Sequence, residues 1–278
     1  MPKNCESMRT LGLGLVAYKI SESEIVALSN SIGNFPLSYK VVVDNSPMAD
    51  AKDLFEQLEW IYFHNPENPG FGASHNFIFE NFARSVDYHL IVNPDISFNG
   101  HVLKHLVDFM NLKTDAGCVM PKVFYPDGRI QRLAKLLPSP KDLFVRRVPF
   151  GSFWSKIIRD YELHEANYDS GIFKVPFLSG CFLMFRVESI LKINFFDERF
   201  FMYAEDIDLC RRLWANKSFP YYYGLTSVVH GYARGSSKSL QLFIIHLSSA
   251  MKYFNKWGWF DRRRLEVNIS CLSQFRKK

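Results

Sequence analysis

Between residues 11 and 110 the chain alternates short apolar runs with amphipathic stretches, and this order restricts the fold more than any other feature. The apolar runs predict strands at about 11–17, 40–44, 61–63 and 88–92. The other stretches predict helices at about 21–31, 50–58, 73–84 and 101–110. Because strands separated by helices usually pair in parallel, we expect an α/β fold whose mostly parallel sheet carries helices on both faces.

Polar residues follow several of these strands, where such sheets usually bind ligands. Asp95, in the sequence Asn93-Pro94-Asp95, can ligate Mg²⁺ or Mn²⁺ together with diphosphate oxygens, although Asn-Pro-Asp is also ordinary turn chemistry. Asp44 can accept a hydrogen bond from the imide N–H of a uracil or thymine ring, or else cap a turn. Tyr18, after the first strand, can stack on the base.

A glycine-bearing loop at residues 68–72 leads into the helix expected from residue 73. Backbone N–H groups at a helix start favour phosphate or sugar oxygens. The loop matches neither a P-loop nor the G-x-G-x-x-G fingerprint, so its pattern alone does not specify a ligand.

Three carboxylates gather in Glu205-Asp206-Ile207-Asp208, directly after the aromatic run at 200–203. Acids this close repel one another beside apolar surface, so a cation or a proton to be moved usually accompanies them. A helix N-terminus would favour either of the first two acids singly. One carboxylate in a partly apolar cleft can act as a general base on a hydroxyl. His230, by itself a structural histidine, becomes a candidate metal ligand beside two acidic motifs.

The second half of the chain is less regular. Residues 135–170 predict a long loop or short-helix insertion, and 177–185 predict one buried strand. Residues 240–257 predict an amphipathic helix with apolar residues at helical spacing, namely Phe243, Leu247, Met251 and Phe254. We expect the variable stretch at 136–171 to govern the choice of acceptor.

A formal net charge of +6 and 16% aromatic residues favour an anionic partner: nucleic acid, a sugar nucleotide or an acidic lipid surface. The basic residues lack the alternation with aromatics that RNA-binding modules show, so no nucleic-acid partner is expected. Near the C-terminus, the aromatic residues Phe254, Trp257, Trp259 and Phe260 precede the basic run 262–264. This segment either rests on anionic lipid or packs on the domain with a solvated basic end.

The five cysteines are scattered, with no C-x-x-C spacing, which indicates neither a zinc site nor a disulfide framework. Cys118 and Cys181 lie in apolar runs and are expected in the core. The sequence shows no apolar stretch of about 18 residues and no signal-peptide pattern. We therefore expect a reduced, cytoplasmic protein.

The ordered set of motifs resembles family 2 glycosyltransferases, most closely the rhamnosyltransferases of bacterial O-antigen, capsule and cell-wall polysaccharide synthesis. The resemblance covers about residues 11–257 and rests on 41–46, 68–72, 93–95, 179–181, 196–201, 205–211 and His230. Two positions depart from the family pattern. Asn93 replaces the first acid of the metal-binding DXD motif, and Ala17-Tyr18-Lys19 stands where the family often has Thr-Tyr-Asn.

The resemblance implies a GT-A fold, with a Rossmann-like sheet and a C-terminal helical extension. The glycosyltransferase domain would span 1–237, with a nucleotide-binding half at about 10–120, an acceptor half at about 121–237 and the extension at 238–278. It further implies an inverting transfer of L-rhamnose from dTDP-β-L-rhamnose, with Mg²⁺ or Mn²⁺ as cofactor. The acceptor would be a lipid-linked oligosaccharide or polysaccharide at the inner face of the bacterial cytoplasmic membrane, with peripheral membrane contact.

Residue roles carried over from the family place Asp206 as catalytic base with Glu205 beside it, and Asp95 and His230 on the metal. The implied donor-binding residues are Ala17, Tyr18, Asp44, Asn45, Gly72, Asn76, Asn93, Pro94 and Asp95. The implied acceptor-binding residues are Trp154, Tyr203 and Glu205.

Three alternatives stay open. A UDP-sugar could replace dTDP-rhamnose, giving a galactosyl-, glucosyl- or galactofuranosyltransferase. A nucleotidyltransferase would share an α/β fold, but its basic glycine-rich N-terminal loop is missing from the sequence. A non-catalytic nucleotide- or glycan-binding protein would bind a donor without hydrolysing it.

Overall fold

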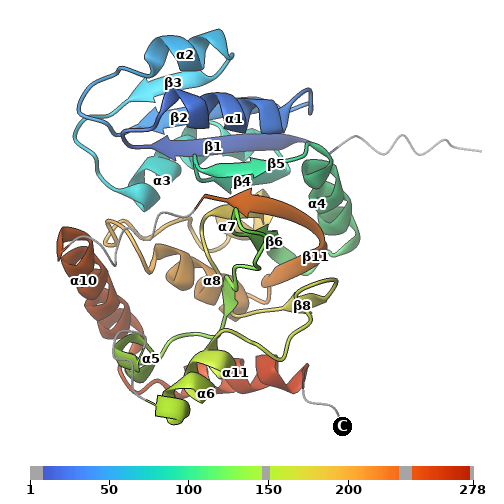
Figure 1. The fold of residues 1–278 in the computed structure, drawn as a ribbon, viewed down its shortest axis with the longest axis vertical. Coiled ribbons are helices and arrows are strands. Elements are labelled where there is room, and N and C mark those ends of the chain that lie inside the picture. The colour runs from blue at the N-terminus through green and yellow to red at the C-terminus, as the bar shows by residue number, and fades with distance from the viewer. Residues whose placement is uncertain (1–8, 146–150, 232–239, 276–278) are drawn as a thin grey trace, which may run out of the picture.

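The computed structural model describes residues 9–145, 151–231 and 240–275, with side chains from 143 to 155 excepted. Its N-terminal half is built on four parallel strands in the order β3-β2-β1-β4, as Figure 1 shows. The strands are β1 (Leu11–Ala17), β2 (Tyr39–Asp44), β3 (Ile61–His64) and β4 (Tyr88–Val92). The intervening helices are α1 (Glu22–Ile32), α2 (Lys52–Gln57) and α3 (Phe71–Asn81), with a 3-10 turn η1 (Ala83–Ser85). These bounds confirm the predicted alternation.

Helices cover both faces of these strands because successive strand residues point to opposite sides. Val41 and Val43 of β2 pack with Ile78 of α3, whereas Val42 joins the main core together with Leu28 of α1. The capping box predicted for α1 is present, with Ser21 as the N-cap residue and Glu24 reaching back to it. Cys118 and Cys181 are buried, as expected.

The second half extends the same sheet, but its pairing is mixed. Beyond β4 the strands run in the order β10-β6-β11-β5, and β8 pairs with β11. They are β5 (Ile96–Phe98), β6 (Ala116–Phe124), β8 (Ile172–Lys174), β10 (Phe182–Arg186) and β11 (Phe219–His230), with helix α4 (His101–Leu112) after β5. β6 and β11 are parallel, whereas β10 is antiparallel to both β4 and β6. Parallel pairing therefore dominates only the N-terminal half.

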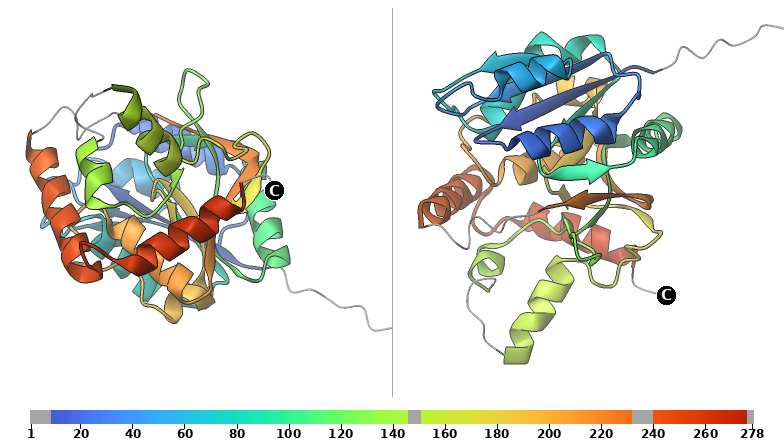
Figure 2. Two further views of the ribbon diagram at one scale, coloured as in Figure 1. Left: turned by 90° about the horizontal axis from the view of Figure 1, so that it is seen from below. Right: turned by 45° about the horizontal axis from the view of Figure 1, so that its top comes forward.

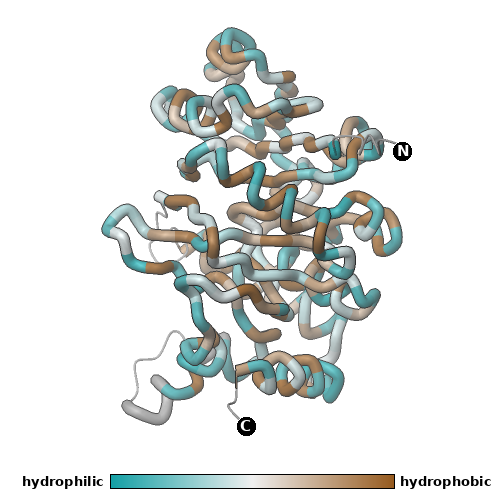
Figure 3. Tube along the Cα trace, turned by 90° about the vertical axis from the view of Figure 1, so that its right-hand side faces the viewer, coloured by the Kyte–Doolittle hydropathy of each residue, from teal (hydrophilic) through white to brown (hydrophobic). Residues whose placement is uncertain are grey.

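The predicted strand at 177–185 is two strands, which corrects that prediction. β9 (Phe177–Leu178) pairs with β7 (Ala134–Lys135) in a separate two-stranded sheet, and β10 enters the central sheet after a turn at 179–181. The insertion carries α5 (Pro140–Val145) and α6 (Gly151–Tyr161), in agreement with the expected short helices. Figure 3 shows that hydrophobic segments concentrate in the central strands.

The C-terminal helices α10 (Leu240–Trp257) and α11 (Arg262–Ser273) pack on the body of the protein near helix α8 (Glu205–Ala215). The short helix α7 (Val187–Leu191) precedes α8 in the chain. In the left panel of Figure 2, α10 lies along the left edge of the fold and α11 runs across its lower part. The buried residues of α10 are Ser249, Ala250, Tyr253 and Phe254. Leu247 and Met251 are exposed, so the predicted apolar face of α10 is only partly the packed one. Among the described residues, no helix has both the length and the apolarity needed to cross a membrane.

Candidate active site

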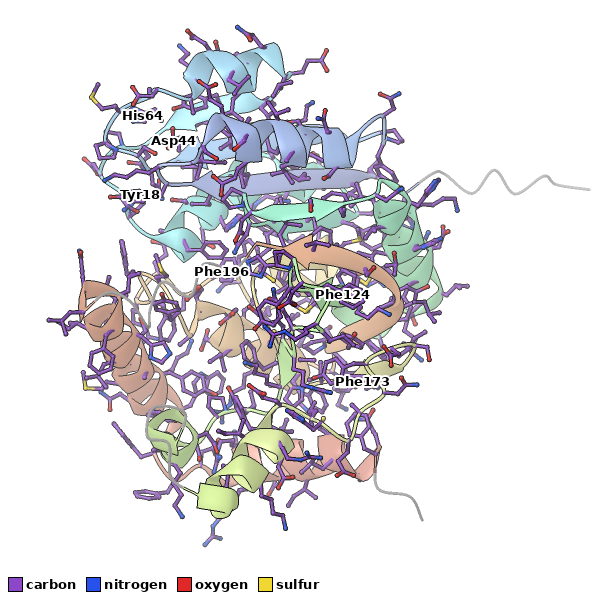
Figure 4. The ribbon with its side chains drawn as sticks, in the orientation of Figure 1. Tyr18, Asp44, His64, Phe124, Phe173 and Phe196 are labelled. Carbon is purple, nitrogen blue, oxygen red and sulfur yellow. The ribbon has the colours of Figure 1, made fainter. Side chains whose placement is uncertain are left out.

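The carboxyl ends of β1, β2 and β3 form one end of the site, because the parallel register sets Ala17 beside Asp44 and Asp44 beside His64. Figure 4 shows Tyr18, Asp44 and His64 at this edge of the sheet. The buried Asp44 carboxylate accepts hydrogen bonds from the Ser46 backbone N–H at 2.9 Å and the Tyr62 hydroxyl at 2.7 Å. Each carboxylate oxygen keeps a second lone pair, which leaves Asp44 able to accept from a ligand.

Tyr62 and His64 extend this edge and were missed by the sequence reading. Burial and the Asp44 carboxylate raise the pKa of Tyr62, so its hydroxyl remains a donor to Asp44. The His64 Nε2 atom lies 2.8 Å from the Ser46 carbonyl oxygen. Both residues belong to a short strand, and only its register with β2 shows that they lie beside Asp44.

The turn after β1 is open to a ligand. The Tyr18 side chain is exposed, and the Lys19 ammonium lies 5.4 Å from the centre of its ring. Lys19 has a φ of 51°, and its backbone N–H donates to Ser46 Oγ at 2.7 Å. Asparagine, which the family often has at this position, tolerates the left-handed conformation better than lysine does. The backbone conformation at Lys19 is therefore one that the family's asparagine would adopt at lower cost. Asn45 is buried and hydrogen-bonds Ser74 at 2.8 Å, so it ties β2 to α3.

Asp95 and His230 come together because the start of β5 pairs antiparallel with the end of β11. His230 Nε2 lies 3.3 Å from Asp95 Oδ1, and the Gly231 N–H donates to the Asp95 carbonyl at 2.8 Å. Burial lowers the pKa of His230, but hydrogen bonds and charge interactions with Asp95 and Cys181 outweigh it and raise the pKa to about 10. The structure thus brings together the two residues that the resemblance assigns to the metal, although the chain separates them widely.

Gln131 fixes the His230 ring. Gln131 Nε2 donates to the His230 backbone carbonyl at 3.0 Å, which turns its Oε1 toward His230 Nδ1, also at 3.0 Å. Nδ1 must therefore carry a proton, and Nε2 faces the Asp95 carboxylate. A histidine oriented through its other nitrogen is the usual arrangement for a metal ligand. Among the described residues, no group of three histidine, cysteine or acidic side chains surrounds a metal position. The donor set fits a divalent cation that takes its other ligands from a diphosphate and water.

Glu205 and Asp206 are the first two residues of α8. Asp206 Oδ2 accepts from the Gly180 N–H at 3.0 Å, and Oδ1 accepts from the Ile207 N–H at 2.8 Å. Burial raises the pKa of Asp206 to about 6, although both backbone donors oppose the rise. Glu205 is buried, and among the residues that the structure describes its Oε2 atom has no hydrogen-bond partner. Burial and the Asp206 charge raise the pKa of Glu205. Two carboxyl groups with raised pKa values therefore stand side by side.

The turn at 179–181 forms hydrogen bonds with both acidic motifs, Asn93–Asp95 and Glu205–Asp208. The Asn93 N–H donates to the Cys181 carbonyl at 2.8 Å, and the adjacent Gly180 donates to Asp206. The turn between β9 and β10 thus links the strand end that carries Asn93, Pro94 and Asp95 to the candidate base. This arrangement could not be read from sequence, because it depends on β10 lying next to β4.

The entry into α8 is strained. Tyr203 and Ala204 have φ values of 69° and 66°, which cost non-glycine residues on the order of 1–2 kcal/mol each. The loop before α3 supports this entry, since the Phe71 N–H donates to the Phe201 carbonyl at 3.0 Å. A Cβ atom on Gly70 would lie 2.3 Å from that carbonyl oxygen, so only glycine fits there. Strain of this kind persists only where the surroundings enforce it, often at functional sites.

Other residues assigned by resemblance lie in supporting positions. Gly72 lets α3 approach Phe196, since a Cβ atom there would lie 2.9 Å from the Phe196 Cβ. Asn76 donates to the Phe196 carbonyl and to Glu198, each at 2.9 Å, and holds the segment before α8. The Ala17 carbonyl accepts from the Asn45 N–H. The Trp154 side chain lies outside the described residues.

The third acid of the cluster, Asp208, is fully buried and faces cations. It accepts from Arg212 Nε at 2.8 Å and Trp257 Nε1 at 2.7 Å, and Lys256 Nζ lies 2.6 Å away. Lys256 also contacts Asp197 at 2.7 Å. The positive charge expected beside the acids is therefore present as protein side chains at Asp208, which anchors α10 to α8.

Comparison with known proteins places this geometry in context. No protein-family profile matches the chain. It is 28% identical over 152 residues to the N-acetylglucosaminyl-diphospho-decaprenol L-rhamnosyltransferase of Mycobacterium tuberculosis, a match covering 55% of this chain and 49% of the relative. The chain thus spans about half the length of that relative. It is 26% identical over 241 residues to rhamnosyltransferase WbbL of Escherichia coli K12, covering 82% of this chain and 86% of WbbL.

Solved structures agree in fold. GalNAc-T7, crystallised with UDP, GalNAc and Mn²⁺, superposes with a TM-score of 0.61 at 13% identity, over 81% of this chain and 43% of that protein. Staphylococcus aureus TarS superposes with a TM-score of 0.55 at 15% identity, over 91% of this chain and 44% of TarS. The chain thus has the GT-A fold, and its ordered motifs and its relatives support a protein similar to the family 2 rhamnosyltransferases.

Proposed function

We propose that the protein is an inverting glycosyltransferase that transfers L-rhamnose from dTDP-β-L-rhamnose to a hydroxyl of a lipid-linked bacterial surface glycan. One observation carries the proposal. A carboxylate with a raised pKa, Asp206, accepts from the Ile207 N–H of α8 and from the Gly180 N–H, which is on the turn that also contacts the Asn93–Asp95 strand end. The names of the relatives support a rhamnosyl donor, and that of the mycobacterial protein supports a polyprenyl-diphosphate-linked acceptor.

In this proposal the reaction is a single displacement. Asp206 takes the proton of an acceptor hydroxyl, and the hydroxyl oxygen attacks the anomeric carbon from the face opposite the diphosphate. The bond from that carbon to the diphosphate oxygen breaks, and a β-linked donor gives an α-linked product. The raised pKa of Glu205 favours its neutral form, which would add no second negative charge beside the base and would offer a hydrogen-bond donor to a sugar hydroxyl.

Donor binding uses the strand ends. Asp44 accepts from the imide N–H of the base, and Tyr18 stacks on its ring. Asp95 and His230 would hold a divalent cation, which neutralises charge on the departing nucleoside diphosphate. The acceptor's lipid carrier would keep the enzyme at the inner face of the cytoplasmic membrane.

The first test is a donor panel of dTDP-rhamnose, UDP-glucose, UDP-galactose, UDP-galactofuranose and GDP-mannose, each with and without Mg²⁺ or Mn²⁺. Thermal stabilisation and slow hydrolysis that favour dTDP-rhamnose support the proposal. Preference for a UDP-sugar would keep the mechanism and replace the donor. Binding without hydrolysis or transfer would instead indicate a non-catalytic binder.

An Asp206→Asn variant tests the base directly. General-base catalysis typically contributes about 10²–10⁴-fold, so we expect a kcat loss of that order with donor affinity unchanged. A variant that keeps its turnover would remove Asp206 from this role.

A further inference from the structure

Helix α10 presents a continuous apolar stripe to solvent. Leu240, Ile244, Leu247 and Met251 follow each other at intervals of four, three and four residues, which places them on one face of the helix. Their exposed fractions are 74%, 57%, 46% and 44%. The opposite face is packed, with Ser249 and Tyr253 buried at 2% and 1%, and the stripe ends at Phe254, which is buried at 3%. Exposed apolar surface of this extent and order usually marks an interaction site.

Beyond its last apolar position, the stripe meets an aromatic and basic turn. Asn255, four residues after Met251, accepts a hydrogen bond from Trp259 Nε1 at 2.9 Å. Trp259 is 43% exposed and Phe260 is 95% exposed, and both Arg262 and Arg263 are exposed at the start of α11. Phe254 and Trp257, which the sequence suggested for lipid contact, are instead turned inward.

The chemistry of this surface selects its partner. Residues 240–257 contain no aspartate or glutamate, and the exposed turn carries arginines. A helix of 18 residues is about 27 Å long, so the stripe is a straight apolar line with a cationic, aromatic end. Aliphatic side chains that enter the acyl region, aromatic rings at the headgroup level and arginines on anionic headgroups are the pattern of an interfacial helix.

From these observations we propose that the α10 stripe (Leu240, Ile244, Leu247 and Met251), together with Trp259 and Phe260 of the following turn, is a docking face for an anionic lipid bilayer. The packed face of the same helix holds the entry to the candidate base. Ser249 Oγ donates to the Met202 carbonyl at 2.7 Å, and the His246 ring lies 5.2 Å from the Tyr203 ring. An apolar hollow between α10 and α8 is lined by Tyr203, Ile207, His246, Ala250 and Phe254.

This geometry places the bilayer on one side of α10 and Asp206 beyond the other. The orientation would present an acceptor carried on a membrane lipid to the base, and this use of the surface rests on the proposed function. The docking itself does not depend on that function. Figure 1 shows α10 on the side of the molecule away from α4, so a matched change on α4 leaves this surface intact.

The experiment is sedimentation of the full chain with phosphatidylcholine vesicles, with and without phosphatidylglycerol. We expect binding to the anionic vesicles, and we expect an Ile244→Gln/Leu247→Gln variant to bind them at least about tenfold more weakly. An Arg262→Gln/Arg263→Gln variant should lose the preference for anionic vesicles. The matched control is Leu112→Gln/Leu225→Gln, because these leucines are 85% and 56% exposed on α4 and β11.

The docking proposal is wrong if the wild-type protein binds neither kind of vesicle. It is also wrong if the Ile244→Gln/Leu247→Gln variant binds as well as the control variant. Concentration-dependent dimerisation that the stripe variant abolishes would overturn it as well, by making a second copy the occupant. Donor hydrolysis without vesicles is measured in parallel. If donor hydrolysis persists when vesicle binding is lost, the proposed enzyme function is unaffected. If the protein binds vesicles but hydrolyses no donor, only the proposed enzyme function is contradicted.

Discussion

Replacing Asp208 by asparagine tests whether this buried acid is structural. Its carboxylate meets Arg212, Lys256 and Trp257 at 2.6–2.8 Å and has no exposed surface. Breaking a buried charge pair by altering one partner costs about 3–5 kcal/mol. Lys256 keeps Asp197, and Arg212 keeps its hydrogen bonds to three backbone carbonyls. We therefore expect the lower end, about 3 kcal/mol in the free energy of unfolding.

Urea unfolding at neutral pH measures this loss, and the matched control is Glu188→Gln. Glu188 and Lys192 form an i,i+4 pair like Asp208 and Arg212, but their side chains are 73% and 55% exposed. The control should cost no more than about 0.5 kcal/mol. Equal losses for the two variants, or a loss below about 1 kcal/mol for Asp208→Asn, would refute the assignment of Asp208 as the anchor of α10.

Three further predictions concern the acids and the loop that positions them. Because the pKa of Asp206 is about 6 and the base must be ionised, kcat/KM should fall about tenfold per pH unit below pH 6; a pH–rate profile that stays flat down to pH 5 would contradict this. Glu205 has a raised pKa in the folded state, so the stability it contributes is present below its unfolded pKa and is lost as the pH rises. Glu205→Gln should therefore raise Tm relative to wild type more at pH 8 than at pH 4.5, and the reverse order would show that Glu205 is ionised. Gly70→Ala should lower the free energy of unfolding by at least about 2 kcal/mol more than Gly128→Ala, because both glycines have positive φ but only a Cβ atom at Gly70 would meet a backbone oxygen. Equal losses in chemical unfolding would show that the close approach of Gly70 to Phe201 does not contribute to stability.

The sequence predicted the parts of the fold whose signals are local. The first four strands and the helices between them follow from periodicity, and the capping box at Ser21 follows from two residues three positions apart. Asp44 and Asp95 were found because carboxylates after buried strands gather at one sheet edge. Asp206 and His230 needed the ordered resemblance as well, since an acid at a helix start and a lone histidine are common structural features.

Tertiary structure decided what depends on pairing between distant segments. Residues 177–185 look like one strand, yet the turn at 179–181 sends the two pieces into different sheets, and this turn supplies the Gly180 N–H to Asp206. Tyr62 and His64 enter the site only through the β2–β3 register. Two partners of Asp208, Lys256 and Trp257, come from α10, far along the chain.

The faces of α10 show the same division. Apolar residues occur all around this helix, so periodicity predicts its existence but cannot say which side is packed. Contacts of Ser249, Tyr253 and Lys256 with the body select that side, and they leave Leu240, Ile244, Leu247 and Met251 in solvent. By itself the sequence determined the local elements and the kinds of residue at their ends, because backbone propensity and side-chain periodicity act over a few residues. Only the tertiary structure decided which of those residues meet, because that depends on pairing and burial across the whole chain.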